Sequence, residues 1–332
     1  MTALEARPDP GAKRADTGPT AWRRATQIPH LGLLIVIAAV VIFTATQSDA
    51  FLTSANMLNV ARQISVVAVL AGGLTLLMTA GGMDFSMGSV AGVSTAICAQ
   101  LSSHGQPLAV AVGVAVLVAI GVGLVNGLVV TIFGVAPFVV TLASATLLDG
   151  VALLIINGLS VTVGPGLNGL GYGTTLGIPN LVLIAVVVLA AIALAMRFTI
   201  FGRDAFAIGG NEDVARLSGI KVNRNKLLLY VLAGLLSAIA GVMLLSRLGA
   251  SSPGTGGLML QLTAVAAVVI GGTSLAGGHG TIVGTALGVL LIGLVANSLN
   301  LLQVSSYYQQ ISVGAVLLLA AISNQIQRRT RH

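Results

Sequence analysis

Three long stretches of the chain, residues 85–148, 150–196 and 248–327, contain no aspartate, glutamate, lysine or arginine. A helix needs about 20 apolar residues to cross a bilayer, so each stretch has room for two or more crossings. Only 8% of the 332 residues are charged and 56% are hydrophobic, which excludes a soluble globular domain and a disordered chain. We therefore expect an all-α polytopic membrane protein.

Turn-forming residues divide the apolar sequence into about ten segments that we expect to cross the membrane as helices. These segments are residues 28–47, 60–80, 88–103, 108–133, 136–156, 180–196, 227–246, 260–275, 281–302 and 310–326. With ten crossings, the N-terminus, the 197–226 loop and the C-terminus share one side, and they carry 14 of the 16 lysines and arginines. Because basic segments stay in the cytoplasm, we expect both termini there.

The chain is expected to hold one membrane domain between two short tails. Residues 1–27 are predicted to be a disordered cytoplasmic tail, 28–326 the transmembrane domain, and 327–332 a basic cytoplasmic end. The first apolar segment is interpreted as a retained helix, because the polar region before it is long for a signal peptide. The glycine-rich segment 157–179 is too irregular for lipid and is expected to cap the external side.

The sequence offers little catalytic or energy-coupling chemistry. No glycine is followed by lysine, so the phosphate-binding loop G-x-x-x-x-G-K-[ST] is absent, and neither H-E-x-x-H nor G-x-S-x-G occurs. The single cysteine, Cys98, allows no intrachain disulfide and makes a thiolate metal site improbable. We expect no enzymatic activity, no metal and no cofactor in this chain, with membrane lipid as its surroundings and no nucleic acid as a partner.

Two glycine-rich segments, residues 81–92 and 271–284, each end one apolar segment with a glycine pair and open the next. They indicate either a shared helix-packing composition or a duplicated helix pair. Glycines four residues apart at 280, 284 and 288, and at 123 and 127, predict close helix packing. Asp84 is interpreted either as an N-cap for a helix near Ser86 or as part of a gate. The candidates for a gate or subunit contact are Asp84, Gly81, Gly82, Gly271 and Gly272.

Polar residues within the apolar segments are candidates for a path that a neutral solute follows. The candidates are Thr75, Thr79, Ser94, Asn126, Thr141, Ser144, Asn297 and Asn300. The alternative for the hydroxyl groups is a hydrogen bond back to their own helix, which is common for serine and threonine in membrane helices.

The 197–226 loop contains the signals of a short capped helix. Asn211 suits an N-cap, Glu212 and Asp213 suit the first turn, and Gly219 suits the position after the end. They predict a helix of about two turns on which Val214 and Leu217 share one face, with Ala215 and Arg216 beside them. A helix this short is marginal in water, so the membrane domain or another protein must hold it. The alternative is an ordinary basic loop.

The stretch Gly202-Arg203-x-x-Phe-Ala-Ile-Gly-Gly-Asn-Glu-x-x-Ala-Arg-Leu-Ser-Gly-Ile220 resembles the coupling loop of monosaccharide ABC import permeases of the ribose type. Three other stretches resemble the same family: residues 81–89, residues 125–127 with 137–142, and residues 266–280. The likeness covers about residues 30–325. It implies a permease subunit of an ATP-driven importer, translocating a monosaccharide or related neutral polyol across a bacterial inner membrane.

The resemblance also implies partners and a site. The implied partners are cytoplasmic ABC ATPase subunits that hold ATP and Mg, a second permease copy or a homologous permease, and a periplasmic or extracellular solute-binding protein. A helix within 211–219 is implied to dock on the ATPase. The implied coupling residues are Gly210, Asn211, Glu212, Val214, Ala215, Arg216, Leu217 and Gly219.

The chain departs from the family pattern at two places. Gln261-Leu262-Thr263 stands where the family often has Glu-Leu-Asp, and Asp149-Gly150 stands where it often has Arg-Gly. These departures leave open which sugar is carried and whether the permease partner is identical.

Two hypotheses from other classes compete with the importer. A stand-alone ion-coupled secondary transporter of small neutral solutes predicts uptake by this chain alone. A membrane scaffold without transport activity predicts that solute flux survives its deletion.

Overall fold

The computed structural model describes residues 30–305, 307, 308, 311, 314 and 315. The expected tails 1–27 and 327–332, and most of the expected segment 310–326, lie outside the described residues. The longer helices are α2 (Leu31–Gln47), α3 (Ser54–Thr79), α4 (Met87–Ser103), α5 (Leu108–Ile132), α6 (Pro137–Ile155), α8 (Asn180–Phe198), α9 (Ile200–Gly210), α11 (Val222–Leu248), α12 (Gly257–Ile270) and α13 (Ile282–Leu301).

Short elements fill the connections. They are β1 (Val161–Thr162), η1 (Pro165–Leu167), α7 (Asn168–Gly171), β2 (Thr174–Thr175), β3 (Ile178–Pro179), α10 (Glu212–Leu217) and β4 (Ala250–Ser251). β1 pairs antiparallel with β4, and β2 pairs antiparallel with β3. The expected cap 157–179 is therefore built from turns, two short helical elements and strand pairs.

The prediction of a helical membrane protein is confirmed, because the structure contains helices that are long and apolar enough to cross a bilayer. Within the described part of the chain, six helices are long and apolar enough: α3, α5, α6, α8, α11 and α13. α2 and α12 are apolar but shorter, and α4 has 17 residues. Nine of the ten expected segments coincide with helices. The count of ten crossings and the side of each terminus stay predictions.

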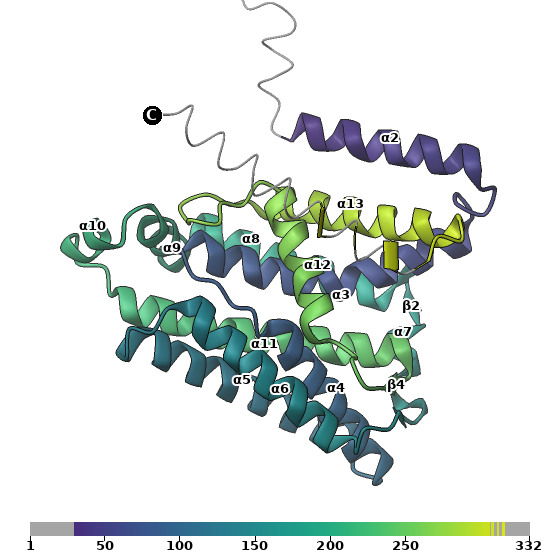
Figure 1. Ribbon diagram of the computed structural model, residues 1–332, viewed down its shortest axis with the longest axis horizontal. Helices are drawn as coiled ribbons and strands as arrows, with labels where there is room; N and C mark the ends of the chain where they lie inside the picture. The colour runs from purple at the N-terminus through teal and green to yellow at the C-terminus, as the bar shows by residue number, and fades with distance from the viewer. Residues whose placement is uncertain (1–29, 306, 309–310, 312–313, 316–332) are drawn as a thin grey trace, which may run out of the picture.

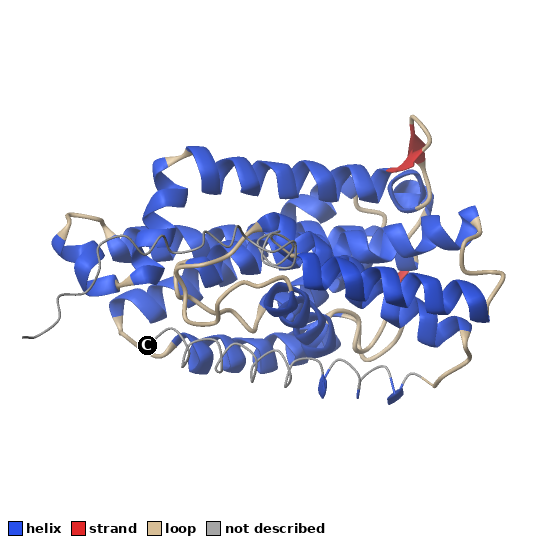
Figure 2. Ribbon diagram, turned by 90° about the horizontal axis from the view of Figure 1, so that it is seen from above, coloured by secondary structure: helices blue, strands red, loops and turns tan. Residues whose placement is uncertain are grey.

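The longer helices lie side by side, most of them along the long axis of the molecule (Figures 1 and 2). α9 and α10 lie at one end, which we call the α10 end, and strands β2 and β4 lie at the opposite end, which we call the strand end (Figure 1). Two hydrogen bonds fix the α10 end: Asn223 Nδ2 donates to the Thr131 carbonyl (3.2 Å), and Gly278 N donates to the Thr79 carbonyl (2.9 Å).

The centre of the bundle is formed by α3, α4 and α11, whose inward residues are buried. Small residues bring the helices together, as predicted. A methyl group on Gly123 would overlap the Tyr230 carbonyl, which joins α5 to α11, and one on Gly288 would overlap the Ala267 carbonyl, which joins α13 to α12. Because lipid supplies no hydrophobic force between helices, such close packing is a main source of their association.

Two helices begin after irregular segments. Residues 80–86 join α3 to α4, and residues 249–256 join α11 to α12. Both follow a long helix and precede a shorter one, as in the broken helices of transporters. Residues 81–92 and 271–284 each follow the end of an apolar helix, α3 or α12, and lead into the next, α4 or α13, as the sequence indicates. Whether they are a duplicated helix pair stays a prediction.

Candidate functional site

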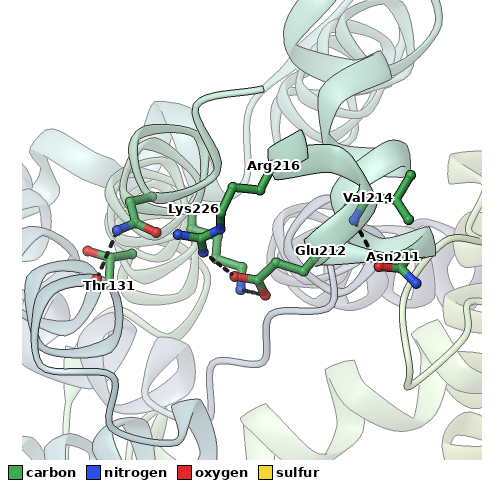
Figure 3. Close-up of polar contacts among 7 residues, drawn as sticks. Thr131, Asn211, Glu212, Val214, Arg216 and Lys226 are labelled. Carbon is green, nitrogen blue, oxygen red and sulfur yellow. Dashed lines mark hydrogen bonds and ion pairs between the residues drawn. The ribbon is translucent and has the colours of Figure 1, made fainter. Parts of the chain in front are cut away.

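Helix α10 has a defined cap at each end (Figure 3). The side-chain oxygen of Asn211 accepts a hydrogen bond from Val214 N at 3.1 Å, which makes Asn211 the predicted N-cap. At the other end, Ile220 N donates to the Ala215 carbonyl and Gly219 N to the Arg216 carbonyl, each at 3.1 Å. Gly219 has φ 84°, so α10 ends at a left-handed glycine, as the sequence predicts, and two backbone hydrogen bonds close that end.

Glu212 links α10 to α11. It accepts from Arg216 one turn later at 3.1 Å and from Lys226 near the start of α11 (Figure 3). The hydrogen bond from Lys226 is the largest cause that holds the pKa of Glu212 below its usual range, and Arg216 adds to it. The carboxylate therefore stays charged at neutral pH and ties the short helix to a long one.

The surface of α10 has an anchored side and an exposed side. Ala215 is buried against Ile208 of α9 and Val222 of α11. Val214 and Leu217 are 58% and 88% exposed, although both are apolar. A cavity of about 480 Å³ lies between α9 and the start of α11 and reaches Ser218 and Gly219 at the end of α10. An anchored helix with an exposed apolar edge is a surface suited to a protein partner.

Helix α9 was missed by reading the sequence as a loop with one short helix. Thr199 caps it, because its side chain accepts from Gly202 N at 3.1 Å. Three glycines lower its intrinsic helix propensity, since Gly202, Gly209 and Gly210 each favour other conformations. The signal that could have found it is the apolar spacing of Phe201, Ala205 and Ile208 after a threonine.

Gly209 connects α9 to two other segments of the α10 end. A methyl group there would lie 2.5 Å from Gly278 N and would overlap the carbonyl of Thr79, the last residue of α3. We call Thr79, Gly209 and Gly278 the glycine junction. Gly81 lies beside it, since a methyl group on Gly81 would be 3.9 Å from the Ala276 carbonyl. The two glycine-rich motifs of the sequence thus meet at the base of the α9–α10 unit.

The remaining glycines of the predicted gate have different surroundings. A methyl group on Gly82 would press on Leu77, and one on Gly271 would overlap Gly284 of α13. Gly272 has φ 88° and open space around it. Gly82 and Gly271 are therefore used in packing, whereas Gly272 allows a turn. A gating role for any of them stays a prediction.

Asp84 is buried in the segment that leads into α4, but it does not cap that helix. Its Oδ1 accepts from Ser86 N at 2.7 Å and from Ser86 Oγ at 2.6 Å, and Ser86 itself occupies the N-cap of α4. The predicted N-cap role is wrong, because the carboxylate bonds to the residue two positions on and closes a turn before the helix.

Gln261 of α12 is a structural residue whose role the sequence did not indicate. Its amide nitrogen donates to the Asp84 carbonyl at 2.7 Å, and its amide oxygen accepts from Gly88 N at 2.9 Å. The side chain is fully buried. A glutamine supplies the donor and the acceptor that this pair of backbone groups needs, whereas an ionised glutamate would supply only acceptors. This departure from the family pattern thus joins α12 to the start of α4.

Several predicted path residues form hydrogen bonds between helices. The hydroxyl groups of Thr75 and Thr285 lie 2.6 Å apart, between α3 and α13. Asn297 and Asn56 exchange two amide hydrogen bonds, of 2.8 and 3.0 Å, between the same helices. Thr75 and Asn297 are buried. Their polar groups are therefore satisfied by neighbouring helices in this conformation.

The other path candidates fall into three groups. Asn126 is buried, donates to Ser86 Oγ at 3.0 Å and accepts from Ser144 Oγ at 2.5 Å. The hydroxyls of Thr79, Ser94 and Thr141 donate to carbonyls four residues earlier, as in the alternative interpretation. Asn300 is exposed near the end of α13. A path role for each stays a prediction.

The expected absence of a metal site stays a prediction. The described residues contain no group of three or more histidine, cysteine, aspartate or glutamate side chains that could hold an ion. Cys98 is buried in α4, and the predicted absence of a cofactor stays an expectation.

Comparisons with known proteins agree with this geometry. Residues 56–321 match the family described as branched-chain amino acid transport system / permease component. The ribose import permease protein RbsC of Bacillus subtilis (strain 168) is 41% identical over 297 residues, which cover 89% of this chain and 91% of the relative. No solved structure matches the chain.

Two further relatives come from Escherichia coli (strain K12). Its ribose import permease protein RbsC is 41% identical over 88% of this chain and 91% of the relative. Its L-arabinose transport system permease protein AraH is 35% identical over 90% and 92%. These relatives are permease components of ABC transport systems in bacterial inner membranes, and they are not enzymes. Because such permeases are parts of larger import systems, the relatives disfavour the hypothesis of a stand-alone transporter. The family match and these relatives, together with the six bilayer-length helices among the described residues, show the family. This chain belongs to the branched-chain amino acid transport system / permease component family, as a multi-pass permease subunit of an ABC transporter.

Proposed function

We propose that this permease carries a monosaccharide or related neutral polyol into the cell, driven by ATP hydrolysed in separate subunits. The names of the similar permeases, which import ribose or arabinose, support a sugar as solute. Three long stretches without an ionisable aspartate, glutamate, lysine or arginine also favour a neutral solute, because an ionic solute needs paired charges along its way.

We further propose ten crossings, with both termini and the α10 end in the cytoplasm. The basic residues support this orientation, since most of them lie in the two tails and in the 197–226 loop. Residues 28–326 then form the transmembrane domain, 1–27 the N-terminal tail, and 327–332 the C-terminal tail. The strand end, including segment 157–179, faces the solute-binding protein outside.

The observation that carries the coupling proposal is the exposed edge of α10, formed by Val214 and Leu217. A rigid, doubly capped helix can insert this edge into a groove of the ATPase. When ATP closes the ATPase, the helix moves as a unit, because Ala215 and Glu212 fix it to α9 and α11. The ATP-closed partner must bind the two permease conformations differently, or ATP could not shift their populations.

Gly209 is the proposed route from this helix to the membrane domain. It joins the α9–α10 unit to the end of α3 and to the α12–α13 loop without an intervening side chain. A displacement of α10 is therefore passed to two bundle segments by direct backbone contact. α3 leads into Asp84 and α4, so the movement reaches the centre of the bundle.

ABC permeases of this family work with an ATPase and a solute-binding protein. For this chain we propose cytoplasmic ABC ATPase subunits that bind ATP and Mg, an external solute-binding protein, and either a second copy of the chain or a homologous permease. No cofactor is proposed for the chain itself.

The test compares two exposed leucines at opposite ends of the bundle. Leu217 lies on α10 and Leu176 lies in the turn between β2 and β3, and they are 88% and 96% exposed. Leu217→Glu is expected to abolish co-purification with the ATPase and ATP-driven uptake, whereas Leu176→Glu keeps the ATPase bound. Retention of the ATPase by Leu217→Glu would contradict the coupling proposal.

Orientation is tested with the same positions as cysteines. The natural Cys98 is buried, so it adds little background. A membrane-impermeant maleimide is expected to label Leu176→Cys in intact cells and Leu217→Cys only after lysis. The reverse pattern would invert the proposed topology.

A further inference from the structure

Helix α6 carries one charged residue, Asp149, in an otherwise uncharged sequence of bilayer length. Asp149 lies six residues before the helix ends, about 9 Å along the axis from the C-terminal end of α6. An ionised side chain is costly in hydrocarbon, and such residues usually face a partner charge, a water-filled cavity or a transport path.

No protein group in the described part of the chain balances this carboxylate. Asp149 makes no hydrogen bond or ion pair there: both ion pairs involve Glu212. The side chain is half-buried and borders a cavity of about 240 Å³. The charge therefore faces solvent within the cavity rather than a protein donor.

The opposite wall of the cavity is formed by residues 251–257. These residues run from β4 into α12, which are both labelled in Figure 1. Gly254, Gly256 and Gly257 have φ between 67° and 82°, so the chain is turned repeatedly there. Irregular backbone at membrane depth is tolerated only where protein buries it or where it lines a water-filled space. The segment is partly exposed, which favours a water-filled space.

This segment packs closely against α4. A methyl group on Gly256 would be 2.7 Å from Gly92 Cα of α4, so the backbones of the two segments nearly touch. A methyl group on Gly257 would be 3.4 Å from Asp149 Oδ1. The absence of side chains at these glycines lets the carboxylate approach the backbone and keeps the cavity open.

We propose that Asp149 and residues 252–257 form a solute-contact subsite that takes the neighbouring hydroxyl groups of a polyol. This inference rests on the proposed function and names the chemistry of one step of the path. A carboxylate accepts two hydroxyl hydrogen bonds at once. The hydroxyls of Ser252 and Thr255 line the same cavity. Each already has one partner, Ser160 Oγ for Ser252 and the Ser252 N–H for Thr255, and each keeps capacity for another hydrogen bond. A monosaccharide ring in this volume would replace several waters.

A cation is the other ligand that such oxygens could take, since carboxylate, hydroxyl and carbonyl oxygens also suit hard metal ions. The single carboxylate and the absence of a ligand cluster among the described residues favour the polyol. A cation site would make sugar uptake depend on that cation, whereas a polyol subsite would not, so one experiment can tell the two ligands apart.

The experiment uses the complete importer, with its ATPase and binding protein, in proteoliposomes with radiolabelled sugar. Asp149→Asn keeps the side-chain shape but removes the charge, and it is expected to lower the uptake rate about tenfold at unchanged ATPase activity, because charge-assisted hydrogen bonds are lost. The matched control is Asp49→Asn, the same change in the exposed turn between α2 and α3. Uptake by the control should equal that of the wild type.

A second measurement does not depend on transport by a variant. Asp149→Cys is expected to react with a small water-soluble thiol reagent and to be protected when sugar-loaded binding protein and ATP are present. No labelling, or labelling without protection, would overturn the subsite. Wild-type uptake that requires a cation, with the requirement lost in Asp149→Asn, would also overturn it in favour of an ion site.

The two proposals fail in different ways. If the wild-type complex carries no sugar, the proposed function fails. If it carries sugar and Asp149→Asn carries it equally well, only the subsite fails.

Discussion

Gly209→Ala should separate the α9–α10 unit from the rest of the bundle. The added methyl group would lie 2.5 Å from Gly278 N, whereas ordinary van der Waals contact begins near 3.4 Å. The Thr79 carbonyl oxygen is nearer still, and Gly278 N donates a hydrogen bond to it at 2.9 Å. The methyl group would push into this contact, so the segments must separate by about 0.9 Å or more. All the groups in the way are backbone, so no rotamer change relieves the overlap.

The energy of this change comes from two opposing terms. Overpacking of this kind costs about 1–3 kcal/mol. Alanine in place of glycine within a helix recovers up to about 1 kcal/mol, because it restricts the unfolded chain and suits the helix better. We expect a net loss of at most about 3 kcal/mol at the glycine junction, concentrated on its two backbone contacts.

The assay is ATP-driven uptake together with ATP hydrolysis in proteoliposomes. Gly209→Ala is expected to keep the ATPase bound, because α10 itself is unchanged, and to move less solute for each ATP hydrolysed. The matched control is Gly121→Ala in α5, a helical glycine with nothing within 4 Å of the added methyl group. Equal solute per ATP for wild type, Gly209→Ala and Gly121→Ala would refute direct backbone coupling at this junction.

Two other predictions concern polar groups. Gln261→Leu leaves the Gly88 N–H and the Asp84 carbonyl buried without a partner, at a cost of about 1–3 kcal/mol each. It should therefore lower the melting temperature in detergent more than Gln261→Glu, which keeps the acceptor for Gly88. Equal melting temperatures for wild type and both variants would contradict this role of Gln261. The lowered pKa of Glu212 means that its stabilising effect is present at neutral pH and is lost as the pH falls through that lowered value. Because Glu212 is partly exposed, this stabilising effect is at most about 1 kcal/mol. Hydrogen exchange of the α10 amides should therefore be faster in Glu212→Gln than in wild type at pH 7, and equally fast in both proteins in acid. A difference that persists in acid would contradict the assignment.

The local features of the fold could be predicted from the sequence because their causes are local. Long apolar stretches with few charges favour helices in a membrane, and nine of the expected segments coincide with helices. The caps of α10 follow from Asn211 and Gly219, because each acts within a few residues of its own position. Family membership followed from short motifs in the same way.

Helix α9 and the role of Asp84 could not be predicted because both depend on neighbours distant in sequence. α9 contains three glycines, which makes it a poor helix by propensity, and it is held by contacts of Gly202 with α8 and of Gly209 with α3. The sequence suggested Asp84 as a cap, but the register of α4 makes Ser86 the N-cap. Asp84 then closes a turn beneath Gln261.

The sequence by itself determined that this chain crosses a membrane many times and carries a short, capped helix between two crossings. Helices that are apolar on every side show no preferred face, so the pattern cannot say which helices touch or which polar groups meet. Only the tertiary structure decided that Thr79, Gly209 and Gly278 meet, that Gln261 joins α12 to α4, and that Asp149 borders a cavity. These contacts depend on close packing between segments far apart in the chain, and the size of a side chain in one segment becomes decisive only when the other segment lies against it.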